Sequence, residues 1–442
     1  MKYTTLASLG VCLPRILLPR RGIDLAKWAV VACDQYTSEP EYWQEVDALT
    51  GSAPSALRLI LPEAYLDGKH DEAALSAGVL QSMEDYQNNG VFAELGEGAV
   101  LVTRSVNGKI RTGLLLAFDL ECYDYTPGSA PLIRPTEGTV TERVMARLAL
   151  RKAATVELPH ILMLLDDPEC TVIEPLRAQP SRRVYNFELM QNGGHITGDY
   201  LPASSLAGLT EALAALAEKL DGREGQPLML YAVGDGNHSL AAAKAAWEAL
   251  KPTLPEAERQ THPARYALCE LVNLHDPGIV FEPIHRVLFG AEEGFAEELR
   301  AILAEQNQGA EFRLLAEDSL GVLAPNCHAL LCLQNGRRGV FLVNGPRQNL
   351  PVGTLQKALE AYLARHEGAR LDYIHGTEAL TKLSAAPNAA GFLLPPMEKE
   401  DLFTTVLTDG VLPKKTFSMG EANEKRYYLE ARALRPRTFA SY

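Results

Sequence analysis

The sequence predicts a mixed α/β fold, and two features of the chain indicate it. Apolar runs suited to buried strands, such as "HILMLL" (160–165) and "PLMLYAV" (227–233), alternate with helical patterns such as "SLAAAKAAWEAL" (239–250). Asn-Gly pairs at 107–108 and 335–336 are each flanked by apolar stretches, which predicts antiparallel hairpins. We therefore expect an α/β core with additional α+β structure.

A polar connector indicates how the chain divides. With 442 residues the chain can form two or three domains, and the segment "LPEAERQTHPAR" (254–265) is typical of a linker between domains. We expect an N-terminal α/β domain over residues 1–254 and a C-terminal α+β domain over 255–442. In the second domain, Asp276-Pro277-Gly278 predicts the turn of a hairpin.

Composition excludes several classes of partner. The chain has 42 Lys and Arg against 56 Asp and Glu, a net charge of -14, and no basic stripe, which argues against nucleic acid. It has no apolar run of bilayer length and no secretory leader pattern, so we expect a cytoplasmic protein without a membrane partner. Its seven cysteines include no C-x-x-C pair, which indicates reduced thiols, and Cys33 is expected to be a core residue.

Two further segments predict helix starts. "WAVVACDQYTSEPEYWQEV" (28–46) is typical of a strand, a loop and a helix, with Asp34 at the end of the strand. Ser38-x-x-Glu41 and Thr139-x-x-Glu142 match capping boxes. After the second box, basic residues recur at helical spacing and form either a solvated face paired with acids or a source of charge for a ligand. These residues are Arg143, Arg147 and Arg151.

The junction "VGDGNHS" (233–239) is the main candidate site. A turn that follows a buried strand and opens a helix presents N–H groups that have no intrahelical acceptor, and these favour an anion, most often a phosphate. Gly234 and Gly236 allow a sharp turn close to a ligand, and Asn237 and Ser239 can cap the helix or donate to ligand oxygens. The alternative is a well-capped strand-to-helix connection without a ligand.

Two side chains of the junction add chemistry. His238 offers a titratable ring that can stabilise a transferring phosphoryl group. Asp235 would repel a phosphate unless it binds Mg²⁺ or acts as a general base. A carboxylate in an anion-binding turn therefore predicts a magnesium ligand at Asp235.

The segment "IRPTEGT" (133–139) is the second candidate. Arg134 and Glu137 lie in a loop before a predicted helix and together could clamp a phosphate and accept a hydroxyl proton. Asp34 resembles Asp235 in its place after a strand, and ligands of open α/β sheets collect at such strand ends.

Beyond residue 254, His275 and His285 could be metal ligands, but no third ligand stands at a matching spacing. Arg286 is the better candidate there, as a positive group that reaches the site from the second domain.

The ordered segments "VVACDQYTSEPEYW", "RPTEGT", "VGDGNHSLAAAK", "PIHRVL" and "LPKKTFSM" resemble a widespread bacterial and archaeal family labelled as a domain of unknown function. That family carries Arg-Pro-His-Glu and Asp-Gly-His-His-Arg signatures. The Asp-Gly-x-His segment also resembles a box of the ParB and sulfiredoxin superfamily, which includes nucleotide-dependent DNA clamps and free-serine kinases. This resemblance implies a ParB/sulfiredoxin-like core whose junction holds nucleotide phosphates.

The chain departs from the family signatures at two positions. Ser239 stands where the family has a phosphate-contacting arginine, and Thr136 replaces the histidine of the first signature. If phosphate binds, its counter-charge must come from other basic residues. The candidates are Arg134, Arg143, Lys244 and Arg286.

These observations favour a small-molecule phosphotransferase. The expected donor is a nucleotide or pyrophosphate with Mg²⁺, and the resemblance to free-serine kinases implies a small hydroxylated acceptor such as serine. The expected catalytic residues are Asp34, Glu137, Asp235 and His238. The alternatives are a ParB-like nucleotide-binding regulatory module and a phosphate-ester hydrolase, with the chain acting as a monomer or a homodimer.

Overall fold

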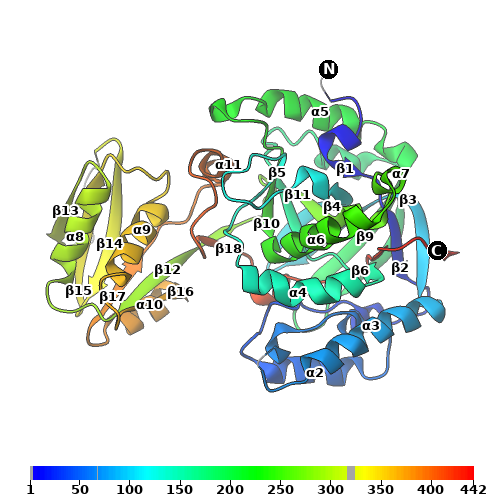
Figure 1. The fold of residues 1–442 in the computed structure, drawn as a ribbon, viewed down its shortest axis with the longest axis horizontal. Coiled ribbons are helices and arrows are strands. Elements are labelled where there is room, and N and C mark those ends of the chain that lie inside the picture. Colours follow the sequence, from blue (N-terminus) through cyan, green and yellow to red (C-terminus); the bar gives the residue numbers. More distant parts are fainter. Residues whose placement is uncertain (1–2, 67, 316–323) are drawn as a thin grey trace. The chain divides into compact units, whose positions relative to one another are not determined.

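The structure, a computed structural model, describes residues 3–66, 68–315 and 324–442 and divides into two compact units (Figure 1). The first unit consists of the residues up to Val280 together with the C-terminal segment Gly420–Tyr442. The second unit is Phe281–Met419. This division differs from the expected boundary at residue 254. The strand β11 (Tyr266–Asn273) lies beyond that boundary but pairs inside the sheet of the first unit, so the polar connector before it, which includes helix α7 (Glu256–Arg259), belongs to that unit.

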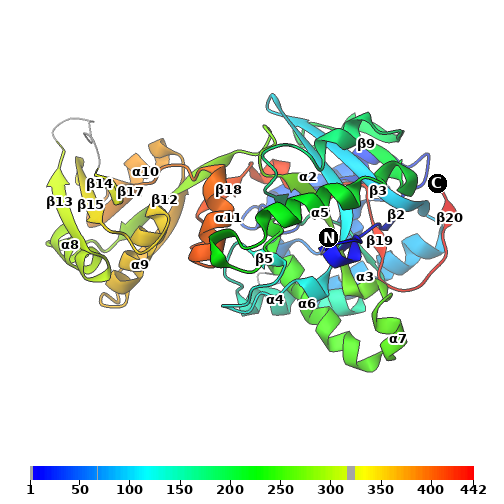
Figure 2. The ribbon, with the colours of Figure 1, turned by 90° about the horizontal axis from the view of Figure 1, so that it is seen from above.

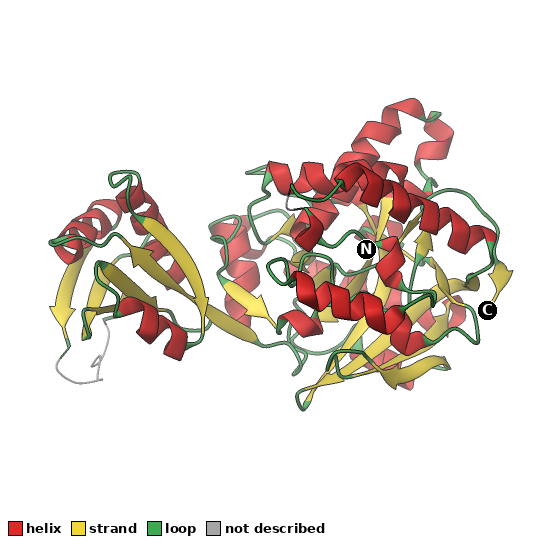
Figure 3. Cartoon of the chain, turned by 90° about the horizontal axis from the view of Figure 1, so that it is seen from below, coloured by secondary structure: helices red, strands yellow, loops and turns green. Residues whose placement is uncertain are grey.

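A large mixed sheet forms the centre of the first unit, as expected of an α/β core (Figure 3). Along it the neighbouring strands are β5 (Ile133–Pro135), β10 (Tyr231–Asp235), β7 (Leu162–Leu165), β11, β4 (Lys109–Asp119), β3 (Phe92–Val106), β9 (His195–Pro202) and β8 (Arg182–Glu188). The pairs β5–β10 and β7–β11 are parallel, and the other neighbours are antiparallel. Short strands β1 (Val11–Cys12), β2 (Arg15–Pro19) and β20 (Ala440–Ser441) pair with β4 or β3.

Both expected Asn-Gly hairpins are confirmed. Asn107 and Gly108 join β3 to β4 with φ angles of 51° and 75°, the left-handed conformation that a two-residue hairpin turn requires. Asn335 and Gly336 join β14 to β15 in the second unit with φ angles of 50° and 70°.

The large sheet is buried on both faces. Along β3, Ala99 and Leu101 belong to one apolar cluster and Val100 and Val102 to the other, because successive strand side chains point to opposite faces. Helices α5 (Leu209–Leu220) and α6 (Asn237–Leu250) contribute to the first cluster, whereas α1 (Leu25–Trp28), α2 (Pro40–Thr50) and α3 (Glu72–Asn88) contribute to the second (Figures 1 and 2). Helix α4 (Thr141–Ala153) packs on α6 through Val144 and Ala241. The short α7 (Glu256–Arg259) follows α6.

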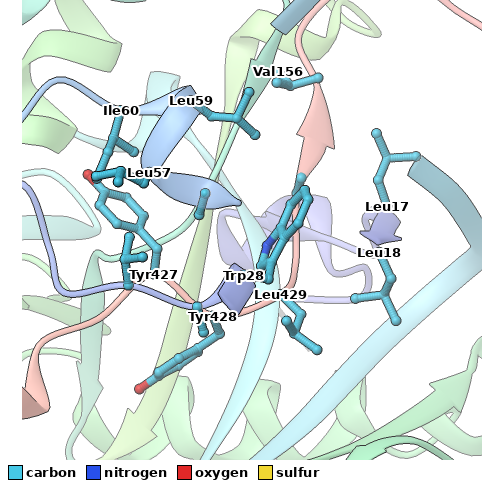
Figure 4. Packing of buried hydrophobic residues seen from close by; sticks show 14 of the residues in the cluster. Leu17, Leu18, Trp28, Leu57, Leu59, Ile60, Val156, Tyr427, Tyr428 and Leu429 are labelled. Carbon is cyan, nitrogen blue, oxygen red and sulfur yellow. The ribbon is translucent and has the colours of Figure 1, made fainter. Parts of the chain in front are cut away.

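The C-terminal segment returns to the first unit and completes its second cluster. Its strand β19 (Arg432–Ala433) pairs with β6 (Val156–Glu157). Tyr427, Tyr428 and Leu429 are buried in the same cluster as Trp28 (Figure 4). The segment is therefore a structural part of the unit that carries the candidate junction.

The second unit contains a separate antiparallel sheet with helices. Its strands are, in order, β13 (Gly309–Leu314), β15 (Arg337–Asn344), β14 (Cys327–Gln334), β17 (Ala389–Leu393), β12 (Phe281–Phe289) and β16 (Arg370–His375), with β18 (Phe417–Met419) paired to β12. Its helices are α8 (Phe295–Gln306), α9 (Pro351–Leu363), α10 (Thr377–Ser384) and α11 (Lys399–Thr408). The hairpin expected around 276–278 does not form, because β11 and β12 belong to different units.

Local expectations near residues 28–40 and 139 were also wrong. The run after Trp28 is extended, but Val31 makes only an isolated bridge, to Arg426, so Asp34 does not end a strand of the sheet. Helices α2 and α4 each begin two residues after the proposed cap, with Glu39 and Val140 in the N-cap positions. Among the described residues, no helix combines the length and the apolar character that a membrane span needs.

Candidate functional site: the β10–α6 junction

The junction has the expected strand, turn and helix. Strand β10 ends at Asp235, Gly236 adopts φ 81°, and α6 begins at Asn237. A Cβ on Gly236 would lie 3.0 Å from Cγ1 and 3.1 Å from Cα of Ile161, so glycine is required by both conformation and space. The N–H groups of the first turn of α6 therefore lie next to the carboxyl end of β10.

Parallel pairing of β5 and β10 brings the two predicted segments together. Pro135 is in register with Val233, and the next residue, Thr136, donates its hydroxyl proton to Val233 O at 2.6 Å. The Asn237 side chain accepts from Thr136 N at 3.2 Å and is buried. The Asn237 side chain thus connects the two loops. The N-cap residue of α6 is Gly236, so no side chain caps this helix.

A lysine from the returning C-terminal segment lies at this junction. Lys425 Nζ is 3.1 Å from Asp235 Oδ2, and Asp235 Oδ1 accepts from Gly236 N at 2.8 Å. Burial alone would lower the pKa of Lys425, but Asp235, with further contributions from Asp34 and Glu137, raises it above its ordinary value. Three of the expected catalytic carboxylates, Asp34, Glu137 and Asp235, therefore act on one ammonium group.

Arginines of α4 form the adjoining side of the site. Arg147 makes an ion pair with Glu63, and its Nη2 is also 3.8 Å from Asp34 Oδ2. Arg143 Nη2 lies 3.6 Å from Glu63 Oε2 and its side chain is 49% exposed. The basic face of α4 is therefore partly paired with acids, and Arg147 links this pairing to Asp34.

A histidine that follows β6 contacts the first turn of α6. His160 Nε2 lies 3.0 Å from Ser239 Oγ, and the His160 ring packs against Tyr427 with ring centroids 4.9 Å apart. Burial lowers the pKa of His160, although Asp34 and Asp235 oppose this effect. A neutral imidazole with its proton on Nδ1 can accept the hydroxyl hydrogen at Nε2.

Cys33 lies beside the site without the properties of a nucleophile. The Tyr427 hydroxyl lies 3.0 Å from Cys33 Sγ. Burial of the thiol, together with the nearby charge of Asp34, raises the pKa of Cys33 to about 12. The thiolate is therefore scarce at neutral pH, as expected of a core cysteine.

Several predicted phosphate ligands have other partners. Arg134 donates to Pro131 O at 3.2 Å and to Pro227 O at 2.8 Å, and both carbonyls precede the strands, away from their carboxyl ends. Lys244 Nζ pairs with Glu248 Oε1 at 2.7 Å one turn further along α6.

His238 and Arg286 are also engaged elsewhere. Val140 N donates to His238 Nε2 at 3.3 Å, which connects α6 to the start of α4. Arg286 belongs to the second unit, where it donates to Lys414 O at 3.0 Å and to Gln356 Oε1 at 3.2 Å.

The donor set does not fit a metal ion held by protein side chains alone. Within the described ranges, no three His, Cys, Asp or Glu side chains gather in a metal-binding group. Both Asp235 oxygens already accept from Gly236 N–H or Lys425. The two histidines weighed as ligands are separated, since His275 pairs with Asp166 in the first unit and His285 accepts from Leu394 N in the second.

Lys425, Glu63 and His160 are site residues that the sequence analysis did not identify. Each comes from a segment distant in sequence from the junction, and none stands in a recognisable local pattern. Only Pro159 before His160 marks a break between α4 and the strand β7. Long-range pairing places Lys425 at the junction, because the neighbouring Arg426 forms a β-bridge with Val31. Such pairing cannot be read from local sequence.

Comparison with protein families shows which family the chain belongs to. A family model described as "Protein of unknown function (DUF1015)" matches residues 17–362. The chain belongs to the DUF1015 family. The resemblance to a family of unknown function, expected from the sequence, is thereby confirmed. Among curated proteins, none matches the chain in sequence.

Solved structures show distant similarity. A free serine kinase in complex with AMP is 11% identical with a TM-score of 0.37, and the match covers 74% of this chain and 94% of that one. A conserved hypothetical protein from Pyrococcus furiosus is 10% identical with a TM-score of 0.36, covering 73% and 95%. C-terminally truncated SbnI from Staphylococcus aureus is 11% identical with a TM-score of 0.32, covering 72% and 82%.

Proposed function

We propose that the protein is a small-molecule phosphotransferase whose phosphate-binding site is the first turn of α6. The observation that carries the proposal is the Lys425–Asp235 contact at this helix start. N–H groups in a first helical turn have no intrahelical acceptor, and the helix dipole favours negative charge there. An ammonium group at the same place adds the cation that a transferring phosphoryl group needs.

The surrounding side chains suit the remaining roles. Arg147 lies beside Asp34 and can offset the charge of the carboxylates that adjoin the phosphate. Asp34 and Glu137 are candidate bases for the acceptor hydroxyl, and His160, kept neutral by burial, is a third. We also propose that the junction holds the phosphates of the donor, a nucleotide or pyrophosphate, as the corresponding segment does in the ParB/sulfiredoxin superfamily.

The experiment is a transfer assay with the full chain. Purified protein is incubated with ATP, ADP or pyrophosphate, Mg²⁺, and serine or related alcohols, and products are identified by mass spectrometry. Lys425→Met should lower the rate by about 100-fold, as removal of a charge-stabilising group typically does. Lys244→Met is the matched control, because Lys244 pairs with Glu248 outside the junction. No phosphorylated product with any donor and acceptor, or equal rates for the two variants, would contradict the proposal.

Phosphate-ester hydrolysis is the second candidate, and the Ser239–His160 contact of 3.0 Å favours it. A serine hydroxyl next to a neutral imidazole is the arrangement of an activated nucleophile. Phosphate release without any acceptor, lost in Ser239→Ala but retained in Lys244→Met, would support hydrolysis over transfer.

A further inference from the structure

A cavity of about 150 Å³ adjoins the junction in the first unit. Apolar side chains from the segment before α3, from α3, from α4 and from β6 form most of its wall, and three of them are labelled in Figure 4. They include Leu59, Ile60, Leu61, Met83, Leu150 and Val156. A cavity of this size with such a lining is large enough for a benzene ring.

The polar side chains that line the cavity are largely engaged with one another. His160 and Ser239, which contact each other, are both lining residues, and so are the members of two ion pairs, Arg147 with Glu63 and Arg151 with Glu157. Asp34 and Asp235 are close enough to His160 to oppose the effect of burial on its pKa. The cavity therefore has a mainly apolar wall, and the His160–Ser239 contact lies where it adjoins the junction.

This lining does not suit serine itself. The ammonium and carboxylate groups of an amino acid would lose hydration against leucine, isoleucine and methionine side chains, and the charged side chains of the lining are already paired with one another, so this burial is costly. An apolar group of up to about six carbons would instead be removed from water, at a gain of roughly 25 cal/mol per Å² of surface. The cavity thus favours a molecule with one polar end.

We infer that the cavity binds the apolar body of the phosphoryl acceptor, an alcohol of about the size of benzyl alcohol, with its hydroxyl at His160 in place of the Ser239 hydroxyl. This inference rests on the proposed phosphotransferase function. It changes the expected substrate class from serine to compact apolar alcohols and makes the cavity wall the determinant of specificity.

The acceptor hydroxyl gives its proton to His160 Nε2 while its oxygen forms a bond to the terminal phosphorus of the nucleotide or pyrophosphate. The bond from that phosphorus to the bridging oxygen breaks, and the electron pair leaves with the donor. The imidazolium that results lies near Asp34 and Asp235, whose charges favour it.

Helix α4 offers a matched pair of variants. Ala146 lines the cavity yet is exposed, so Ala146→Leu can reduce the available space without overpacking the core. Ala149 is exposed on the same helix and does not line the cavity, so Ala149→Leu makes the same chemical change elsewhere.

Binding is measured without a phosphoryl donor, by titrating benzyl alcohol into protein with ¹³C-labelled methionine methyl groups. The Met83 methyl lines the cavity and should shift, whereas the Met163 methyl, in the other apolar cluster, should not. Ala146→Leu should weaken binding at least tenfold and Ala149→Leu less than twofold, and serine should leave Met83 unshifted. No shift at Met83, or equal affinity in both variants, overturns the inference.

Transfer assays separate the two proposals. In one outcome, benzyl alcohol shifts the Met83 methyl while neither it nor any other acceptor is phosphorylated. That result would show that the cavity binds a ligand and would contradict phosphotransfer. Phosphorylation of serine in a protein that does not bind benzyl alcohol would support phosphotransfer and overturn the inference about the acceptor.

Discussion

Lys425 Nζ lies 3.1 Å from Asp235 Oδ2, which joins the returning C-terminal segment to the carboxyl end of β10. The two side chains are 23% and 27% exposed, so this ion pair contributes roughly 0–1 kcal/mol to stability. Because Asp235 holds the Lys425 ammonium at the start of α6, we expect Asp235→Asn to lower the transfer activity strongly, whereas the melting temperature should change by only a few degrees. Differential scanning calorimetry and the transfer assay on the same preparation check this, and a large loss of stability would instead indicate a structural role.

His160 should set the acidic limb of the pH profile. Because burial lowers its pKa, the imidazole is neutral at neutral pH, and protonation removes its ability to accept a proton only when the pH falls below the ordinary histidine range. The rate should therefore be flat around neutral pH and fall in acid, and His160→Gln should lower the rate and remove that limb. If the fall of the rate in acid persists unchanged in His160→Gln, another group is responsible for it.

Glu430 should make stability depend on pH in the neutral range. Its side chain is fully buried, the Tyr185 hydroxyl donates to Oε1 at 2.7 Å, and burial raises the pKa of Glu430 to about 7. Since the folded-state pKa lies above that of the unfolded chain, the stability that the protonated form contributes is complete in acid and is lost as the pH rises through about 7. Urea unfolding between pH 5 and 8 should show this loss in the wild type.

The Glu430→Gln variant tests the assignment. Glutamine keeps an acceptor for Tyr185 and cannot ionise, so its stability should fall less than that of the wild type between pH 5 and 8. Glu421→Gln is the control, because Glu421 is exposed on the same segment. Parallel curves for Glu430→Gln and the wild type would rule out Glu430 as the source.

Gly236→Ala should destabilise the first unit and disturb the junction. The residue has φ 81°, and an added Cβ would meet Ile161 at 3.0 Å. The expected loss is about 1–3 kcal/mol in the free energy of unfolding. Gly138→Ala is the control, since Gly138 has no neighbour within 4 Å of an added Cβ and no positive φ. Chemical denaturation of both variants measures the difference, and equal stabilities would mean that the turn tolerates a side chain.

Local signals in the sequence predict local structure well. The Asn-Gly pairs form their hairpins, and the Gly-Asp-Gly segment joins a strand to a helix, because short-range conformational preferences decide these turns. The helix starts at α2 and α4 were displaced because Glu39 and Val140, not Ser38 and Thr139, take the N-cap positions. Sequence patterns of capping thus locate a helix but not its first residue.

Long-range pairing decides what the sequence could not show. Lys425 reaches Asp235 because residues 420–442 fold back onto the first unit, and no local pattern marks this return. Arg134 lies in the predicted segment, but its guanidinium is directed to Pro131 O and Pro227 O. The sequence therefore indicated the two candidate loops, whereas tertiary contacts bring them together and determine which side chains adjoin the junction.

A crystal structure of the full chain with pyrophosphate would show whether the first turn of α6 binds phosphate beside Lys425. We expect phosphate oxygens within hydrogen-bond distance of the first-turn N–H groups of α6 and of Lys425 Nζ, with the anion absent in crystals of Lys425→Met and retained in those of Lys244→Met. Pyrophosphate bound only at another place, or bound at the junction equally in both variants, would contradict it.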